Sequence, residues 1–132
     1  MKYLLDTNIC IHLFRGKFNL LEKFEKINLN DCAISEITYA ELIFGAENSA
    51  NPEKNLEIID SFVSQIKVIP IFNAVHLYAK EKVRLRKNGN MISDFDMLIG
   101  CTAIANDLIM VTENLKEFER IKGINMENWV KR

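Results

Sequence analysis

The chain has 132 residues, of which 48% are hydrophobic and 27% charged, and its formal net charge is −1. The length and composition are typical of one globular domain of about 100–150 residues, so we expect residues 1–132 to form a single domain. The composition excludes an overall basic field for nucleic acid, and no apolar run approaches the roughly 18 residues that cross a bilayer.

Short apolar segments alternate with segments of helical spacing along the whole chain. In chain order they predict a strand (2–5), helices (7–16 and 18–27), a strand (32–34), helices (35–48 and 56–66), a strand (67–72), helices (73–87 and 95–105), a strand (108–112), a helical turn (115–120) and a possible last strand (124–130). Pro70 favours an edge position or the end of its strand. This alternation predicts a three-layer α/β/α sandwich with a mostly parallel central sheet.

Asp6 and Glu41 differ from most of the 18 acidic residues because their surroundings are apolar. Asp6 follows the first strand and opens a helix. It is therefore either an N-cap or a group at the carboxyl edge of a parallel sheet, where ligands bind. The neighbours of Glu41 on its helix face are mainly apolar or small, and a glutamate there resists burial unless it is paired or metal-bound. A glutamate that reaches solvent from the rim of the core is the alternative.

Asp94 and Asp96 begin the helix at 95–105, which is apolar nearly all round. The helix dipole favours an acid in the first turn, so one of the two needs no functional explanation. Ser93 or Asp94 can cap this helix. Of the two acids Asp94 is the better placed for capping, whereas Asp96 shares the buried face with Gly100 and Ala103. The small residues at 100 and 103 would also allow this helix to approach another element closely.

Asp6, Glu41 and Asp96 are expected to converge at the carboxyl edge of the sheet. Two carboxylates about 4 Å apart repel by roughly 4 kcal/mol at an effective dielectric constant near 20. Three together require raised pKa values or a divalent cation, and oxygen ligands of this kind suit Mg²⁺ or Mn²⁺. The sequence therefore predicts a carboxylate site for one of these cations.

Four short motifs occur in order along nearly the whole chain. They are LLDTN at 4–8, ITYAEL at 37–42 with Gly45, DMLI at 96–99, and VTEN at 111–114 followed by EF at 117–118. Together they resemble the PIN-domain ribonucleases, and most of all the VapC toxins of bacterial type II toxin–antitoxin pairs. The resemblance implies a PIN-like fold and a metal-dependent endoribonuclease.

The resemblance also implies roles for individual residues. Asp6, Glu41 and Asp96 occupy the family's catalytic acidic positions, with Asp6 and Asp96 as the direct ligands of Mg²⁺ or Mn²⁺. A second set would orient water, metal or substrate: Thr7, Asn8 and Thr112.

The family often has a fourth acid just after this threonine, and in this chain that position is Asn114. Asn114 is therefore a further candidate for the site, with Glu113 or Glu117 as possible substitutes for the missing acid. Asp94 is either an additional acid of the site or only a cap.

The resemblance favours hydrolysis by water that leaves a 5′-phosphate, on a structured RNA such as a tRNA. Attack by the 2′-hydroxyl of the RNA itself normally uses histidine pairs. The two histidines, His12 and His76, lie on predicted helices with apolar neighbours, and we interpret them as structural. The basic residues of 73–87 are candidates for phosphate contact or a solvated helix face.

Three aromatic residues are candidates for stacking on bases or, alternatively, for the core or an interface: Tyr39, Phe95 and Trp129.

The resemblance implies a small antitoxin of the VapB type, whose tail covers the acidic cleft, and a homodimer. A cytoplasmic location fits the absence of a signal-peptide pattern at the N-terminus and the three scattered cysteines without a CxxC pair. No organic cofactor is expected.

Two other classes of function compete with the ribonuclease. A catalytically silent PIN-like protein-binding module is supported by the missing fourth acid and opposed by the intact Asp6, Glu41 and Asp96. A nucleotide-binding protein would need a glycine-rich loop after the first strand, where the sequence has none.

Overall fold

The computed structural model describes residues 1–132. Five strands form one sheet in the order β3-β2-β1-β4-β5, and every neighbouring pair is parallel. The strands are β1 (Tyr3–Leu5), β2 (Cys32–Ser35), β3 (Lys67–Ile69), β4 (Ile109–Val111) and β5 (Met126–Glu127). The α-helices are α1 (Thr7–Phe14), α2 (Leu20–Glu25), α3 (Glu36–Glu47), α4 (Pro52–Val63), α5 (Val75–Lys87), α6 (Asp94–Ala105) and α7 (Leu115–Phe118), with 3₁₀ turns η1 (Leu29–Asp31) and η2 (Phe72–Ala74).

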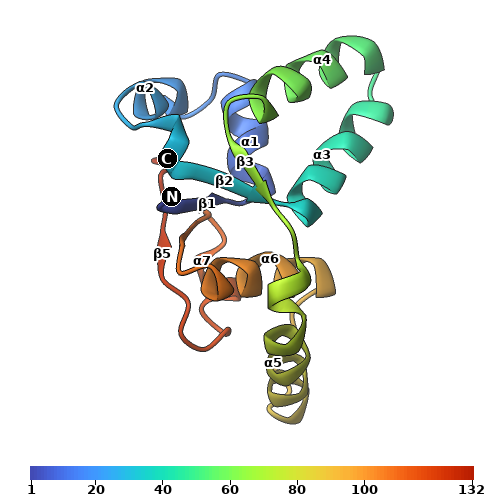
Figure 1. The fold of residues 1–132 in the computed structure, drawn as a ribbon, viewed down its shortest axis with the longest axis vertical. Coiled ribbons are helices and arrows are strands. Elements are labelled where there is room, and N and C mark those ends of the chain that lie inside the picture. The colour runs from blue at the N-terminus through green and yellow to red at the C-terminus, as the bar shows by residue number, and fades with distance from the viewer.

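The helices form two layers, one on each side of the sheet. Helices α1 to α4 lie on one side and α5 to α7 on the other, with both chain ends beside β1 (Figure 1). This arrangement confirms the predicted α/β/α sandwich. None of the helices has the length and apolar character needed to span a membrane.

Each face of the sheet has its own hydrophobic core. Side chains alternate along a strand, so the adjacent residues Leu4 and Leu5, both fully buried, point to opposite faces. Leu4 packs in the cluster that includes residues of α5, α6 and α7, and Leu5 packs in the cluster that includes residues of α1 to α4. Burial on both faces explains why the central strands β1 and β4 are continuously apolar.

Some helices and strands begin or end at other residues than predicted, in α4 because of its capping residue. Helix α4 begins at Pro52 rather than near residue 56, because the Asn51 side chain accepts the Lys54 N–H at 3.3 Å and proline suits the first helical turn. Strand β3 ends before Pro70 and lies at the sheet edge, as predicted. The last strand is reduced to Met126–Glu127 at the opposite edge.

The connections bring several chain segments to the carboxyl edge of the sheet. Strands β1 and β2 lead directly into α1 and α3, and β4 leads through a short turn into α7. Helix α6 precedes the parallel strand β4 and therefore starts at this same edge. Because the chain leaves β1 toward β2 and later returns to β4 on its other side, the edge above β1 is a topological switch point, where ligands bind in open α/β sheets.

We expect Gly100→Ala to destabilise the fold. A Cβ at Gly100 would lie 2.5 Å from Cδ1 of Ile121 and 3.3 Å from Cδ1 of Phe118. Both side chains are buried, so neither can move away freely, and overpacking of a core costs about 1–3 kcal/mol. The gain in helix propensity, about 1 kcal/mol, is smaller than most of this range of costs. The matched control is Gly45→Ala on α3, where no atom lies within 4 Å and stability should rise. Urea unfolding measures both; equal stabilisation by the two substitutions would contradict the close packing of α6.

Candidate functional site

Asp6 is a buried carboxylate at the end of the central strand. The residue is 6% exposed, and its Oδ1 accepts the Thr7 backbone N–H at 2.8 Å as the N-cap of α1. Burial raises the pKa of Asp6 to about 6, against a lowering by hydrogen bonds from Thr112 and Thr7 and a further rise caused by Asp96 and Glu41. Asp6 is therefore the N-cap of α1, and it also lies at the carboxyl edge of the sheet, near Asp96 and Glu41.

Thr112 connects Asp6 to the end of β4. The Thr112 hydroxyl donates to Asp6 Oδ2 at 2.8 Å and accepts the Asn114 backbone N–H at 3.0 Å. Thr112 is fully buried, so this chain of hydrogen bonds fixes the rotamer of Asp6 from a residue 106 positions away. The fixed rotamer holds the carboxylate at the sheet edge.

Thr7 connects Asp6 to Glu41. The Thr7 hydroxyl donates to Glu41 Oε1 at 2.6 Å and lies 3.1 Å from the hydroxyl of the buried Thr38. Thr38 is one turn before Glu41 on α3, which packs against α1. The carboxylate of Glu41, half-buried, is therefore held beside the first turn of α1, and the neighbouring Asn8 is exposed there.

Asp96 and Glu117 form the other side of the cluster. The cap of α6 is Ser93 and not Asp94 as predicted: the Ser93 hydroxyl accepts the Asp96 N–H at 3.2 Å. Burial raises the pKa of Asp96, and Glu117 and Glu41 raise it further. Glu117 itself is held by Asn114, whose side-chain amide donates to Glu117 Oε2 at 2.7 Å. Asn114 thus positions a carboxylate from one turn away, and Glu117, which the sequence offered only as one of two substitutes, faces Asp96.

The other acids considered from the sequence point elsewhere. The Asp94 carboxylate accepts from Lys82 Nζ and from the Tyr78 hydroxyl, both at 2.8 Å, and its pKa is lowered chiefly by Lys82. Asp94 is exposed and binds α6 to α5 rather than facing Asp6.

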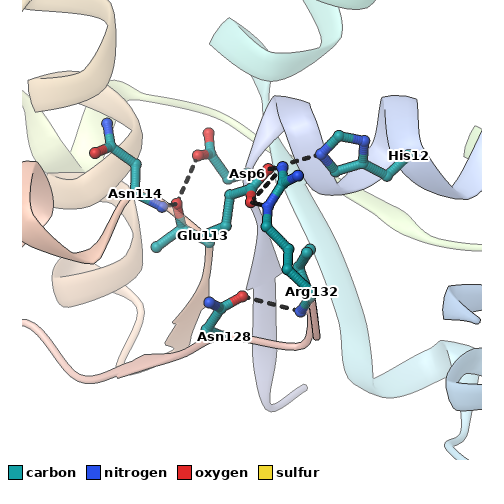
Figure 2. Close-up of polar contacts among 8 residues, drawn as sticks. Asp6, His12, Glu113, Asn114, Asn128 and Arg132 are labelled. Atoms are coloured by element: carbon teal, nitrogen blue, oxygen red, sulfur yellow. Dashed lines mark hydrogen bonds and ion pairs between the residues drawn. The ribbon is translucent and has the colours of Figure 1, made fainter. Parts of the chain in front are cut away.

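Glu113 is engaged in a separate network at the C-terminus. Its carboxylate lies between the His12 ring, 2.7 Å away, and the Arg132 guanidinium, 3.0 Å away (Figure 2). The hydrogen bond from His12 is the largest cause of the lowered pKa of Glu113. His12 also packs edge-on against Phe18, which agrees with its interpretation as a structural residue.

Of the predicted aromatic residues, Trp129 is part of the core. It is 8% exposed and packs edge-on against Tyr3 and Phe24. Tyr39 is half-buried against the core of α1 to α4, whereas Phe95 is 52% exposed.

The donor set of the cluster fits a hard divalent cation. The cluster supplies carboxylate oxygens from Asp6, Glu41, Asp96 and Glu117. A bound cation would lower the free-energy cost of their mutual repulsion and of burying their charges. No three acidic, histidine or cysteine side chains converge on one point in this arrangement. Mg²⁺ commonly takes one or two protein carboxylates, with water and substrate phosphate completing its coordination.

Comparisons with known proteins agree with this architecture. The PIN domain family matches residues 3–124. The tRNA(fMet)-specific endonuclease VapC of Salmonella typhimurium is 35% identical over 98% of both chains, and that of Shigella flexneri is 38% identical over 98% of both. This chain belongs to the VapC family of PIN-domain proteins. Ribonuclease VapC2 of Haemophilus influenzae is another VapC relative, at 38% identity over 98% of this chain and 99% of its own.

Solved structures of VapC-containing complexes share the fold. The DNA-bound VapBC complex of Salmonella typhimurium contains a chain with a TM-score of 0.91, 36% identity and 98% coverage of both chains. VapBC2 of Rickettsia felis, bound to a promoter DNA fragment, gives a TM-score of 0.85 at 36% identity, with 98% of this chain and 99% of the other covered.

We expect Asp6→Asn to stabilise the protein at neutral pH and not in acid. Since the pKa of Asp6 is about 6 when folded and ordinarily 3.8, the folded state binds the extra proton between these values. The cost of ionising Asp6 is therefore absent below the lower value and complete above the upper one, where it is on the order of 3 kcal/mol.

Thermal unfolding of both proteins without divalent cations, at about pH 4 and about pH 8, measures this difference. Asp60→Asn, at an exposed position of α4, is the control. A gain for Asp6→Asn that is equal at both pH values would show that burial does not penalise this carboxylate.

Proposed function

We propose that this VapC-family protein is the endoribonuclease toxin of a toxin–antitoxin pair. It hydrolyses RNA phosphodiester bonds with Mg²⁺ or Mn²⁺ bound by Asp6 and Asp96. The observation that carries the proposal is a buried carboxylate, Asp6, whose pKa is raised by burial and by two acids at a sheet edge. The names of relatives at 35–38% identity, ribonuclease VapC2 and tRNA(fMet)-specific endonuclease VapC, support the RNA-cleaving activity.

The proposed chemistry divides the work between the cation and the side chains. A bound divalent cation supplies positive charge to the scissile phosphate and lowers the pKa of water. Thr112 and the Thr7 N–H hold Asp6 in one rotamer, and the Thr7 hydroxyl holds Glu41. Glu41 orients the attacking water, and Thr7 and Asn8, at the first turn of α1, orient the substrate. Hydrolysis by water leaves a 5′-phosphate.

We propose Glu117 as the fourth acid of the site, with Asn114 as the residue that positions it. The hydrogen bond between the two and the effect of Glu117 on the pKa of Asp96 support this assignment. Glu113 is unsuited to the role because its carboxylate is paired with His12 and Arg132.

The proposed substrate is a structured RNA such as a tRNA. Two of the relatives are named for activity on tRNA(fMet). The net charge of this chain is −1, so the protein as a whole does not attract RNA. A cation bound at the carboxylates would supply the positive charge that attracts the phosphate.

The proposed partner is a VapB-like antitoxin whose tail lies over the acidic cleft. The solved relatives are complexes named VapBC. A groove of about 230 Å³ supports this proposal, because it joins apolar residues of α1, α3 and α4 to Glu41. Its lining includes Ile11, Phe14, Leu42, Ile58 and Ile59. An apolar side chain of the tail fits the groove, and a tail arginine would pair with the carboxylates. A homodimer and a cytoplasmic location complete the proposal.

Cleavage of total RNA tests the proposal. Purified, partner-free protein with Mg²⁺ or Mn²⁺ should give discrete products that EDTA abolishes. Asp6→Asn, Glu41→Gln and Asp96→Asn should each lower the rate at least about 100-fold, because each removes a charge used in the transition state. Glu117→Gln should lower it more than Glu113→Gln, its matched control in the same segment.

The controls separate the possible outcomes. Asp60→Asn should cleave like the wild type. Asp94→Asn tests whether the site is confined to the four clustered acids. No cleavage by folded protein with either cation would favour the catalytically silent binding module, and cleavage that survives both Asp6→Asn and Asp96→Asn would contradict the assigned site.

A further inference from the structure

A hollow of about 660 Å³ lies beside Glu41, and two exposed phenyl rings form part of its lining. Its lining consists of Thr7, Asn8, Ile11, Ala40, Glu41, Phe44 and Phe95. The hollow is therefore continuous with the site, since Thr7 and Glu41 belong to both. Its volume lies within the range of about 300–1,000 Å³ that is usual for ligand sites.

Phe44 and Phe95 are displaced from the core although both belong to well-packed helices. Phe44 is 69% exposed and Phe95 is 52% exposed, whereas Phe24 and Phe118 are at most 5% exposed. Phe44 follows Glu41 by one turn of α3, and Phe95 directly precedes Asp96 on α6. The two rings thus come from the same helices as two of the clustered acids.

We propose that Phe44 and Phe95 stack on the unpaired nucleobases next to the scissile phosphate. This inference rests on the proposed ribonuclease function. A phosphate bound at the carboxylates has a nucleotide on each side, and the hollow has Glu41 and both rings in its lining. Proteins commonly recognise RNA loops by splaying bases onto aromatic side chains, and phenylalanine is one of those used.

The chemistry of the hollow favours a base over other ligands. Its apolar lining from Ile11, Ala40 and the two rings suits the face of a base, and the amide of the exposed Asn8 can hydrogen-bond to a base edge. Stacking is tolerant of base identity because every base has a π-face. Phe44 and Phe95 therefore select unpaired nucleotides over duplex and contribute affinity, while catalysis stays with the carboxylates.

Substitutions that remove the ring but keep an apolar side chain test the proposal. Phe44→Leu and Phe95→Leu should each raise KM for a hairpin RNA with its cleavage position in the loop by about tenfold, with kcat nearly unchanged. Phe95→Tyr should retain the wild-type KM, because it keeps the ring. Leu21→Ala, which removes an apolar side chain that is 61% exposed on α2, is the control.

A second arm is independent of turnover. Fluorescence anisotropy of a labelled single-stranded RNA, measured with Asp96→Asn protein, should show the same loss of affinity for the leucine variants. An RNA with abasic nucleotides beside the cleavage position should bind equally weakly to the protein that keeps both phenylalanines and to the Phe44→Leu and Phe95→Leu variants.

The outcomes separate this inference from the proposed function. If wild-type protein binds the single-stranded RNA through the rings but does not cleave, the proposed function fails while the stacking stands. If it cleaves and the leucine variants keep both KM and RNA affinity, the stacking is wrong. A change of oligomeric state in the leucine variants, measured by light scattering, would identify the rings as a protein interface and would also overturn the inference.

Discussion

The structure depends on keeping an ionisable carboxylate, Asp6, inside the protein at the end of its central strand. Burial opposes the charge of Asp6, and Glu41 and Asp96 oppose it further, so its pKa rises to about 6. Hydrogen bonds from Thr112 and Thr7 offset only part of this cost. A fold that needed only a helix cap would place this group in water, where capping is equally effective and ionisation costs nothing. The free-energy cost of ionising a buried Asp6 is explained if its charge binds a cation.

The parallel sheet explains how acids from four separate segments reach the same edge of the sheet. Strands β1 and β4 are neighbours, so the residue after β1 meets the threonine after β4 across the sheet edge. Helix α3 leaves the same edge from β2 and carries Glu41, and α6 starts there with Asp96 before returning to β4. The close approach of α6 to Ile121, which Gly100 permits, keeps that helix against the segment that follows α7. The order of the strands therefore determines where the site lies, and each of its acids is at the start of a helix or within the first two turns of one.

The sequence predicts the fold class and three of the four clustered acids, because an acid in an apolar setting is visible in the local pattern. Asp6 after a strand, Glu41 on a mainly apolar face and Asp96 on a buried helix face all have this signature. Glu117 lacks it: the sequence places Asn114 at the family position, and only the geometry of one helical turn shows that Asn114 donates to Glu117. Pairing with distant residues is equally invisible, as in Asp94 with Lys82 and Glu113 with Arg132. Local spacing does not encode such long-range partners.

The most direct test of the central claim is whether a cation and the loss of one charge relieve the same repulsion. Thermal unfolding at neutral pH, with and without Mn²⁺ on protein first treated with EDTA, measures both effects. Wild-type protein should be stabilised by Mn²⁺, by about 2.7 kcal/mol at a hundredfold excess over Kd. Asp6→Asn and Asp96→Asn should show little or no gain with Mn²⁺, whereas Asp60→Asn should respond like the wild type. Equal stabilisation of all four proteins would place the cation elsewhere and contradict the account.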